Sequence, residues 1–93
     1  MEIESIAHKP LRAFFLTGDT KGVPEVERVR RMLAFLLMAE HFDRLTAPPN
    51  FGLHALTGNR KGAYAMTVTR NWRLTFSRID DTTVGSLNLE DYH

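Results

Sequence analysis

Residues 63–77 read AYAMTVTRNWRLTFS and carry the clearest structural pattern in the chain. Large apolar side chains recur at every second position on both sides of a polar pair, Arg70-Asn71, and this is the period of β-strands. The pattern predicts two strands that are joined by a tight turn and have one apolar face each. The residues on these faces are Tyr64, Met66 and Val68 in the first strand and Trp72, Leu74 and Phe76 in the second.

Two shorter patterns extend this sheet. Leu53 to Leu56 predicts a short strand before a glycine-flanked loop at 57–62. Thr83 to Leu89 predicts a last strand with a bulge at Gly85, after a turn at Asp80-Asp81. The second half of the chain is therefore expected to fold as an antiparallel sheet of about four strands.

The first half of the chain follows a helical period instead. A short strand at Ile3 to Ile6 precedes a helix that opens with Pro10 and stops at Gly18. Proline suits a first helical turn, and glycine suits the left-handed residue that follows a last one. The apolar face of this helix consists of Leu11, Phe14 and Phe15.

A second, longer helix begins at Pro24 and carries two apolar stripes, where a surface helix needs only one. The main stripe consists of Val26, Val29, Leu33, Leu36 and Leu37, and the second stripe of Met32, Phe35 and Phe42. The second stripe is either core, between the first helix and the sheet, or an exposed strip that binds a partner. Two helices packed on such a sheet make an α+β fold.

Length and composition restrict the class of protein. Ninety-three residues form a single domain, residues 1–93, whose thin core excludes a deeply enclosed cofactor. The chain has no cysteine, so disulfides and thiolate metal sites are excluded. The apolar run Met32 to Ala39 is too short to cross a bilayer, and the acidic start Met1-Glu2-Ile3-Glu4 is unlike a signal peptide. We therefore expect a cytoplasmic protein without a membrane partner.

Charge is distributed unevenly along the chain. Residues 51–79 carry five basic side chains and no acidic one, whereas residues 80–93 carry four acidic side chains and no basic one. The basic block indicates an anionic partner, with nucleic acid as the first candidate. The alternative is a solvated sheet face that the acidic tail balances in space.

Three groups of residues have side chains suited to chemistry. Arg73 lies in mid-strand on the polar face, where a guanidinium can hold a phosphate bidentately. Arg60 and Lys61 lie in the loop between two glycines and could grip a backbone phosphate. His54 and the ending Glu90-Asp91-Tyr92-His93 offer general acids and bases. Each group has a structural alternative: a solvated arginine, a polar turn, a structural histidine or a frayed tail.

Other chemistries lack their motifs. The four histidines show no metal-ligand spacing, and neither the serine nucleophile elbow nor a nucleotide-binding glycine loop is present. We expect no metal and no cofactor.

Four motifs carry a resemblance to a known family. They are His8-Lys9-Pro10-Leu11, Leu53-His54-Ala55-Leu56 with Gly58-Asn59-Arg60, Asn71-Trp72-Arg73-Leu74-Thr75-Phe76, and the ending Glu90-Asp91-Tyr92-His93. With these motifs at this spacing, the chain resembles the HigB-type toxins, the killer-protein branch of the RelE/ParE superfamily of bacterial toxin–antitoxin systems. The resemblance covers nearly the whole length.

The resemblance implies a fold, an activity and partners. The fold would have helices packed on one side of a small, curved antiparallel sheet. The activity would be that of an mRNA endonuclease in the decoding site of the 70S ribosome. The partners would be a cognate HigA-like helix-turn-helix antitoxin and, through the toxin–antitoxin complex, operator DNA.

The resemblance also implies roles for single residues. A metal-free ribonuclease can use the 2′-OH of RNA as nucleophile, and it needs a base, positive charge on the phosphorane and an acid. Arg73 matches the residue that stabilises phosphate and transition state. His54 and His93 are candidates for base and acid, with neither role assigned, and Asp91 and Tyr92 complete the catalytic set. The expected RNA-binding residues are Arg60, Lys61 and Arg70.

The chain departs from the family pattern at Thr57, where many relatives have lysine, and at Asn59, where aspartate is common. The lost lysine removes one phosphate ligand. Two alternatives therefore stay open: a ParE-like toxin that inhibits gyrase, and a catalytically weakened domain that binds an antitoxin. Arg73 and the tail favour the nuclease, and Thr57 favours the weakened domain. The second apolar stripe would be a hypothetical antitoxin contact.

Overall fold

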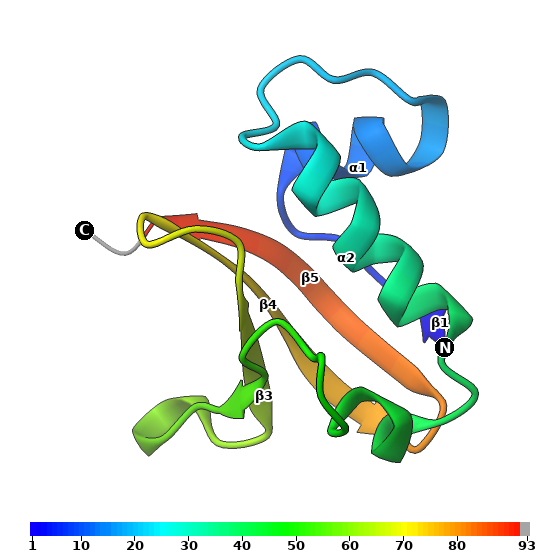
Figure 1. Cartoon of the computed structure of the whole chain (residues 1–93), viewed down its shortest axis with the longest axis vertical. Helices are drawn as coiled ribbons and strands as arrows, with labels where there is room; N and C mark the ends of the chain where they lie inside the picture. The colour runs from blue at the N-terminus through cyan, green and yellow to red at the C-terminus, as the bar shows by residue number, and fades with distance from the viewer. Residues whose placement is uncertain (92–93) are drawn as a thin grey trace.

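The computed structural model describes residues 1–91, in which two helices lie against one face of a twisted sheet (Figure 1). Its strands are β1 (Glu2–Ile3), β2 (His54–Ala55), β3 (Ala63–Thr67), β4 (Trp72–Asp80) and β5 (Thr83–Asp91), in the spatial order β1-β5-β4-β3-β2. The helices are α1 (Lys9–Thr17) and α2 (Val26–Met38), with short 3-10 turns η1 (Phe42–Leu45) and η2 (Gly58–Arg60). Across residues 1–91, no helix has the length and apolar character that a membrane span requires.

The expected antiparallel meander is present as β2 to β5. In β3 and β4, Tyr64 lies opposite Phe76 and Met66 opposite Leu74, so the predicted apolar faces coincide and point to the helices. The predicted opening strand is also present, at Glu2–Ile3 instead of Ile3 to Ile6, and it joins the sheet as a fifth strand by pairing in parallel with β5. The result is a five-stranded mixed sheet with helices on one side, as an α+β fold requires.

The predicted bulge in β5 is confirmed and lies one residue beyond Gly85. The register with β4 shifts by one residue there, and Ser86 takes a left-handed φ of 51°. Its backbone N–H leaves the strand ladder and donates to Ser5 Oγ at 2.8 Å. Val84 and Leu87 are three positions apart, so a regular strand would place them on opposite faces of the sheet. The extra residue of the bulge places both on the inner face, where both are fully buried.

Both predicted ends of α1 are confirmed within a residue. His8 precedes the helix, and its Nδ1 accepts a hydrogen bond from the N–H of Leu11 at 3.1 Å. Gly18 follows the helix with a φ of 80° and donates its N–H to Phe14 O at 2.9 Å. The motif histidine His8 therefore has a structural task, which is to cap a helix.

Replacing Gly18 with alanine is expected to lower the free energy of unfolding by about 1 kcal/mol, because a Cβ is strained at positive φ. A Cβ there would meet no atom within 4 Å, so the backbone strain is the whole effect. Thermal unfolding should show a melting temperature about 4–8 °C lower. Gly18→Asn is the control, and its free energy of unfolding should fall by less, since asparagine tolerates this conformation. Equal losses in both variants would contradict this explanation.

The helix α2 begins two residues after the predicted Pro24, since Glu25 takes a left-handed φ of 48° just before it. Two of the three side chains in its second apolar stripe belong to the core: Met32 is 0% exposed and Phe42 only 4%, and Phe42 lies beyond the helix in η1. The third, Phe35, is half-buried and packs against the core. The hypothesis that Met32 and Phe42 contact an antitoxin is therefore wrong. Both belong to the hydrophobic core cluster, and the Phe42 ring lies 4.8 Å from that of Tyr64 in β3. A thin domain needs every large apolar side chain in its core.

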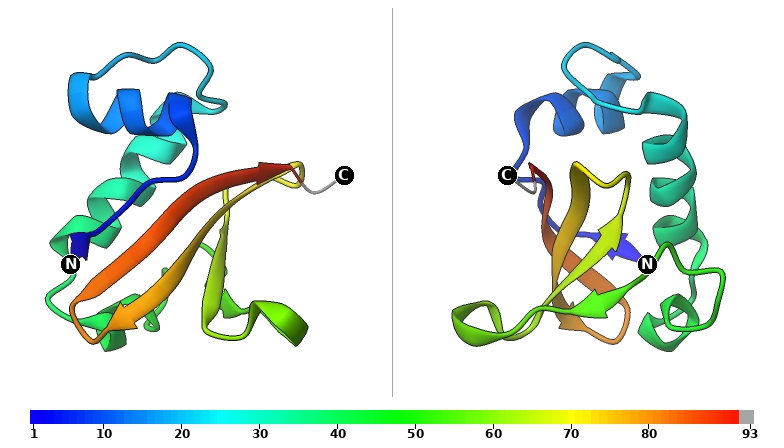
Figure 2. Two further views of the ribbon diagram at one scale, coloured as in Figure 1. Left: turned by 180° about the vertical axis from the view of Figure 1, so that it is seen from behind. Right: turned by 60° about the vertical axis from the view of Figure 1, so that its left-hand side comes forward.

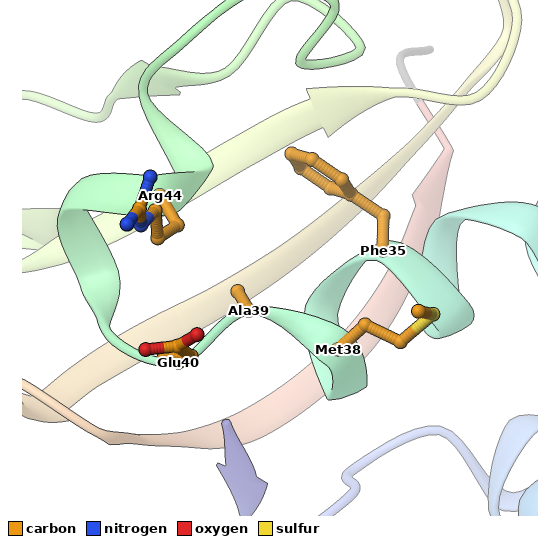
Figure 3. A pocket seen from close by; sticks show the side chains of 5 residues that line it. All are labelled: Phe35, Met38, Ala39, Glu40 and Arg44. Atoms are coloured by element: carbon orange, nitrogen blue, oxygen red, sulfur yellow. The ribbon is translucent and has the colours of Figure 1, made fainter.

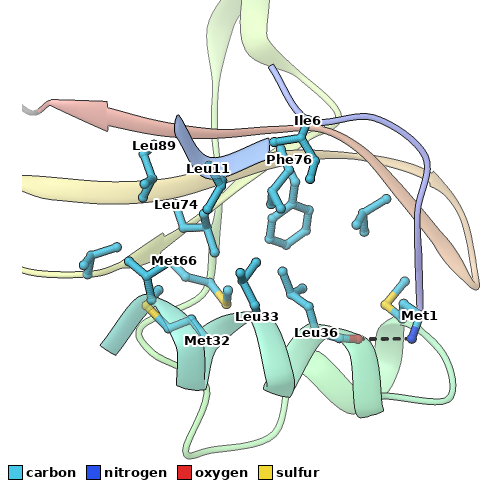
Figure 4. Close-up of a cluster of buried hydrophobic side chains, with 14 of the residues drawn as sticks. Met1, Ile6, Leu11, Met32, Leu33, Leu36, Met66, Leu74, Phe76 and Leu89 are labelled. Atoms are coloured by element: carbon cyan, nitrogen blue, oxygen red, sulfur yellow. Dashed lines mark hydrogen bonds between the residues drawn. The ribbon is translucent and has the colours of Figure 1, made fainter. Parts of the chain in front are cut away.

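The hydrophobic core lies between α1, α2 and the inner face of the sheet (Figure 4). Met1 closes one end of it: its side chain is buried, and its ammonium group donates to backbone carbonyls at the end of α2. These acceptors are Leu36 O at 3.1 Å, Leu37 O at 2.9 Å and Ala39 O at 2.6 Å. A positive group at the C-terminal end of a helix is favoured by the helix dipole. Because α1 and α2 both lie on the inner face, neither of them covers the outer face of the sheet.

Candidate functional site

A cluster of four side chains lies on the outer face of the sheet, around the carboxylate of Glu90 in β5. Glu90 Oε1 accepts from Arg60 Nη1 at 2.8 Å and from Arg73 Nη2 at 3.1 Å. Glu90 Oε2 accepts from Arg60 Nη2 at 2.6 Å and from Thr75 Oγ1 at 2.6 Å. One carboxylate therefore holds two guanidinium groups together, and it holds Arg60 with a bidentate pair of hydrogen bonds.

Strand register explains why these residues meet. Arg73 in β4 lies directly opposite Glu90 in β5, and Thr75 lies two residues along β4 on the same face. Thr75 is 2% exposed and forms the floor of the cluster. Arg60 reaches the cluster from η2, which projects from the sheet away from the helices (Figure 2).

The electrostatics of the cluster keep Glu90 ionised. Hydrogen bonds from Arg60 in the first place, and from Thr75 and Arg73, lower the pKa of Glu90 from 4.5 to about 2 against the opposing effect of burial. The same bonds raise the pKa of Arg60. A carboxyl group with such a pKa is a poor proton donor or acceptor near neutral pH, so Glu90 acts here as a fixed negative charge.

This lowered pKa predicts a loss of stability in acid. Because the pKa of Glu90 is lower in the folded than in the unfolded chain, its contribution is complete above about pH 5 and disappears as the pH falls towards 2. We expect wild type to exceed Glu90→Gln in the free energy of unfolding by about 2 kcal/mol at pH 7, after solvent screening is allowed for. Urea unfolding at pH 7, 4 and 3 should show this gap closing, whereas a gap independent of pH would contradict the assignment.

His54 faces the same side of the sheet as the cluster. It lies opposite Ala65 of β3, which in turn lies opposite Thr75 of β4. Its side chain is exposed, and Nδ1 is 3.0 Å from Gly52 O. A carbonyl oxygen only accepts, so Nδ1 carries the hydrogen of the neutral ring. In this tautomer of the neutral ring, the lone pair is on Nε2.

The remaining predicted site residues lie around this face. Lys61 directly follows η2 and is exposed, and Arg70 is exposed in the turn between β3 and β4. Asp91 ends β5 opposite Trp72, so strand alternation turns it to the side opposite Glu90. Tyr92 and His93 lie outside the described residues. The structure thus brings Arg60 and Arg73 together, with His54 on the same face, whereas strand alternation assigns Asp91 to the other face of β5.

The basic block of residues 51–79 divides into two kinds of side chain. Arg78 is a structural residue, because it bonds Asp81 at 3.2 Å and lies 4.3 Å from the centre of the Phe42 ring. Arg60 and Arg73 both form an ion pair with Glu90. The acidic tail therefore balances part of the basic block, in agreement with one of the two interpretations of the sequence.

Thr75 was not among the predicted site residues, and Glu90 was predicted only as part of the chain's ending, among candidate acids and bases, and not as an ion-pair partner of arginine. Strand alternation did place Thr75 on the face of Arg73. The position of Glu90 depends on the register between β4 and β5, and the bulge at Ser86 shifts this register by one residue. Thr57, where the chain departs from the family pattern, lies immediately before η2. Its side chain is exposed and makes no hydrogen bond that caps this turn.

Other parts of the described chain offer no competing site of this kind. Within residues 1–91, no group of three or more histidine, cysteine, aspartate or glutamate side chains could hold a metal ion. A pocket of about 340 Å³ lies between the end of α2 and η1 (Figure 3), away from the Glu90 cluster. Its lining is mainly apolar, from Phe35, Met38, Ala39, Glu40 and Arg44.

Comparisons with known proteins agree with this geometry. A YafQ structure from E. coli strain BL21(DE3) has a TM-score of 0.66 at 15% identity and covers 98% of this chain and 92% of that one. A YoeB/ParE toxin from Agrobacterium tumefaciens has a TM-score of 0.60 at 9% identity, with both chains fully covered. At these identities the likeness is one of fold.

The sequence comparisons go further than fold. The chain is 39% identical to a protein named Endoribonuclease HigB from Proteus vulgaris, over 98% of this chain and 99% of that protein. A family model described as RelE-like toxin of type II toxin-antitoxin system HigB matches residues 4–93. The chain therefore belongs to the family of HigB-like toxins of type II toxin–antitoxin systems.

Proposed function

We propose that this toxin is a ribosome-dependent endoribonuclease that cleaves mRNA by attack of the RNA's own 2′-OH on the adjacent phosphate. The observation that carries the proposal is the pair of guanidinium groups, Arg60 and Arg73, held side by side on the open face of the sheet. Two such groups suit a phosphate whose negative charge increases in the transition state. The identity of 39% with an endoribonuclease supports the same activity.

In this mechanism, Arg73 stabilises the phosphorane and His54 contributes a general base. The Nε2 of His54 has the lone pair that removal of a 2′-OH proton requires. His93, Tyr92 and Asp91 are the candidates for the acid that protonates the leaving 5′-oxygen. Lys61 and Arg70, both exposed, contact the RNA backbone on either side.

Membership of this family implies an antitoxin as partner. We propose that the antitoxin is a HigA-like helix-turn-helix protein, that the toxin–antitoxin complex binds operator DNA, and that the free toxin acts in the cytoplasm on the 70S ribosome. Because the ribosome presents the mRNA, the toxin does not need to bind free RNA tightly. Its net charge of only +1 is consistent with such a role.

A growth experiment separates this function from its two alternatives. Induced expression of wild type is expected to arrest growth, and Arg73→Ala is expected to leave growth unaffected. Arrest by Arg73→Ala together with gyrase inhibition in vitro would support a ParE-like toxin instead. Normal growth with well-expressed, folded wild type would support a weakened domain.

The role of the 2′-OH is tested by a synthetic mRNA with one 2′-deoxynucleotide at a mapped cleavage position. We expect cleavage to disappear at that position and to continue at the others, since DNA lacks the nucleophile. Continued cleavage at the deoxynucleotide would exclude attack by the neighbouring 2′-OH.

A further inference from the structure

We propose that Glu90 is a positioning residue that joins Arg60 and Arg73 into one phosphate-binding site. This inference rests on the proposed function for its substrate, an RNA phosphate, and goes beyond it by assigning a role to Glu90. Its first support is the hydrogen bonding: both carboxylate oxygens accept two bonds each, three from guanidinium groups and one from Thr75.

The second support is the place of Arg60 in the fold. Arg60 lies on η2, none of whose residues is buried, and the hydrogen bonds of that turn are long, at 3.4 Å from Arg60 N to Thr57 O. The bidentate bond to Glu90 therefore ties the side chain of an exposed turn to the rigid centre of the sheet. Arg73 needs no such tether, because its own strand positions it.

The third support is the charge balance of the cluster. Two guanidinium groups this close repel each other, and a single carboxylate between them removes that repulsion. Glu90 by itself does not neutralise the pair, since these three groups together carry two positive charges and one negative charge. A guanidinium has five N–H donors, and the two hydrogen bonds from Arg60 to Glu90 use one donor on each of two nitrogens, Nη1 and Nη2.

The fourth support is the low exposure of the carboxylate, whose side chain is 19% exposed against 40% for Arg60. Because Glu90 is the less exposed of the two side chains, we expect an incoming phosphate to meet the guanidinium of Arg60 first. The Thr75 hydroxyl, on the floor of the cluster, holds the carboxylate in this position at 2.6 Å. Glu90 therefore stays in place when phosphate binds and does not compete with it.

The test uses Glu90→Gln, which keeps the shape of the side chain and removes its charge. Its control is Asp81→Asn, which removes the same charge from a carboxylate that also bonds an arginine, Arg78, elsewhere on β4. We expect Glu90→Gln to lower kcat/KM for ribosome-bound mRNA about 10–100-fold, mostly through KM, and Asp81→Asn to stay within about twofold of wild type. Unfolding curves fix a temperature at which all variants are folded.

Two readouts distinguish positioning from a merely structural role. The first readout is a double-variant cycle. Adding Arg60→Ala to Glu90→Gln should lower kcat/KM by less than about a further threefold, because Glu90 acts through Arg60. The pH profile of kcat should keep the same limbs in Glu90→Gln, as a group with a pKa of about 2 does not titrate there. Additive losses or a missing limb would overturn the proposal.

A binding experiment decides the inference even without cleavage. In a titration with inorganic phosphate followed by NMR of arginine side chains, wild type should shift Arg60 and Arg73 together. Glu90→Gln should bind phosphate at least tenfold more weakly and show a more mobile Arg60. Equal phosphate affinity and an equally ordered Arg60 in both proteins would overturn the positioning role, whereas failure of wild type to cut mRNA would overturn only the proposed function.

Discussion

Arg73→Ala is expected to lower the rate of mRNA cleavage on the ribosome by about 10²–10³-fold, the usual loss when one donor to a transition-state oxyanion is removed. The size follows from position: Arg73 lies on a central strand, is only 22% exposed, and bonds Glu90 at 3.1 Å. A rigid, partly desolvated guanidinium stabilises developing charge better than a mobile one in water. Single-turnover cleavage of a message on stalled ribosomes measures the loss.

Two controls accompany this variant. Arg31→Ala removes the same charge from an exposed position on α2 and should cleave like wild type. Arg73→Lys keeps the charge but loses the planar group, and its rate should lie between those of wild type and Arg73→Ala. A folded Arg73→Ala protein that cleaves at the wild-type rate would remove Arg73 from the mechanism.

Met32→Ala is expected to lower the free energy of unfolding by about 2–5 kcal/mol, a large share of the roughly 5–15 kcal/mol that holds a small domain folded. Met32 is 0% exposed between α2 and the sheet, so truncation leaves a cavity in a core that is already thin. The same helix offers a matched control in Met38, which is 82% exposed. Met38→Ala should change stability by less than about 0.5 kcal/mol.

Chemical denaturation of both methionine variants at neutral pH measures this difference. A loss below about 1 kcal/mol in Met32→Ala would mean that the second stripe is not core and would restore the hypothesis of an antitoxin contact. Comparable losses in both variants would mean that α2 is held by its helical propensity rather than by its buried face.

Local patterns predicted most of the fold, for physical reasons that can be named. The alternation of Trp72, Leu74 and Phe76 depends only on strand geometry, and all three side chains pack against the core. Gly18 ends α1 with a left-handed φ, which glycine adopts without strain because it has no Cβ, so this helix end could be predicted from the residue type alone. Arg73 on the outer face follows from the same alternation, so this part of the candidate site was also predictable.

Contacts between distant segments were not predictable in the same way. The bond between Arg60 and Glu90 joins a turn to the last strand, and it depends on the register of β5 after its bulge. The parallel pairing of β1 with β5 joins the two ends of the chain and has no local signature. The stripe with Met32 was ambiguous because periodicity shows which residues share a face, and only packing shows what covers it.

The decisive measurement is primer extension on mRNA in a purified translation system, with wild type, with Arg73→Ala and with ribosomes withheld. We expect new 5′ ends inside codons with wild type and ribosomes together, few or none with Arg73→Ala, and none without ribosomes. An intact message in the presence of folded wild-type protein and translating ribosomes would contradict the account.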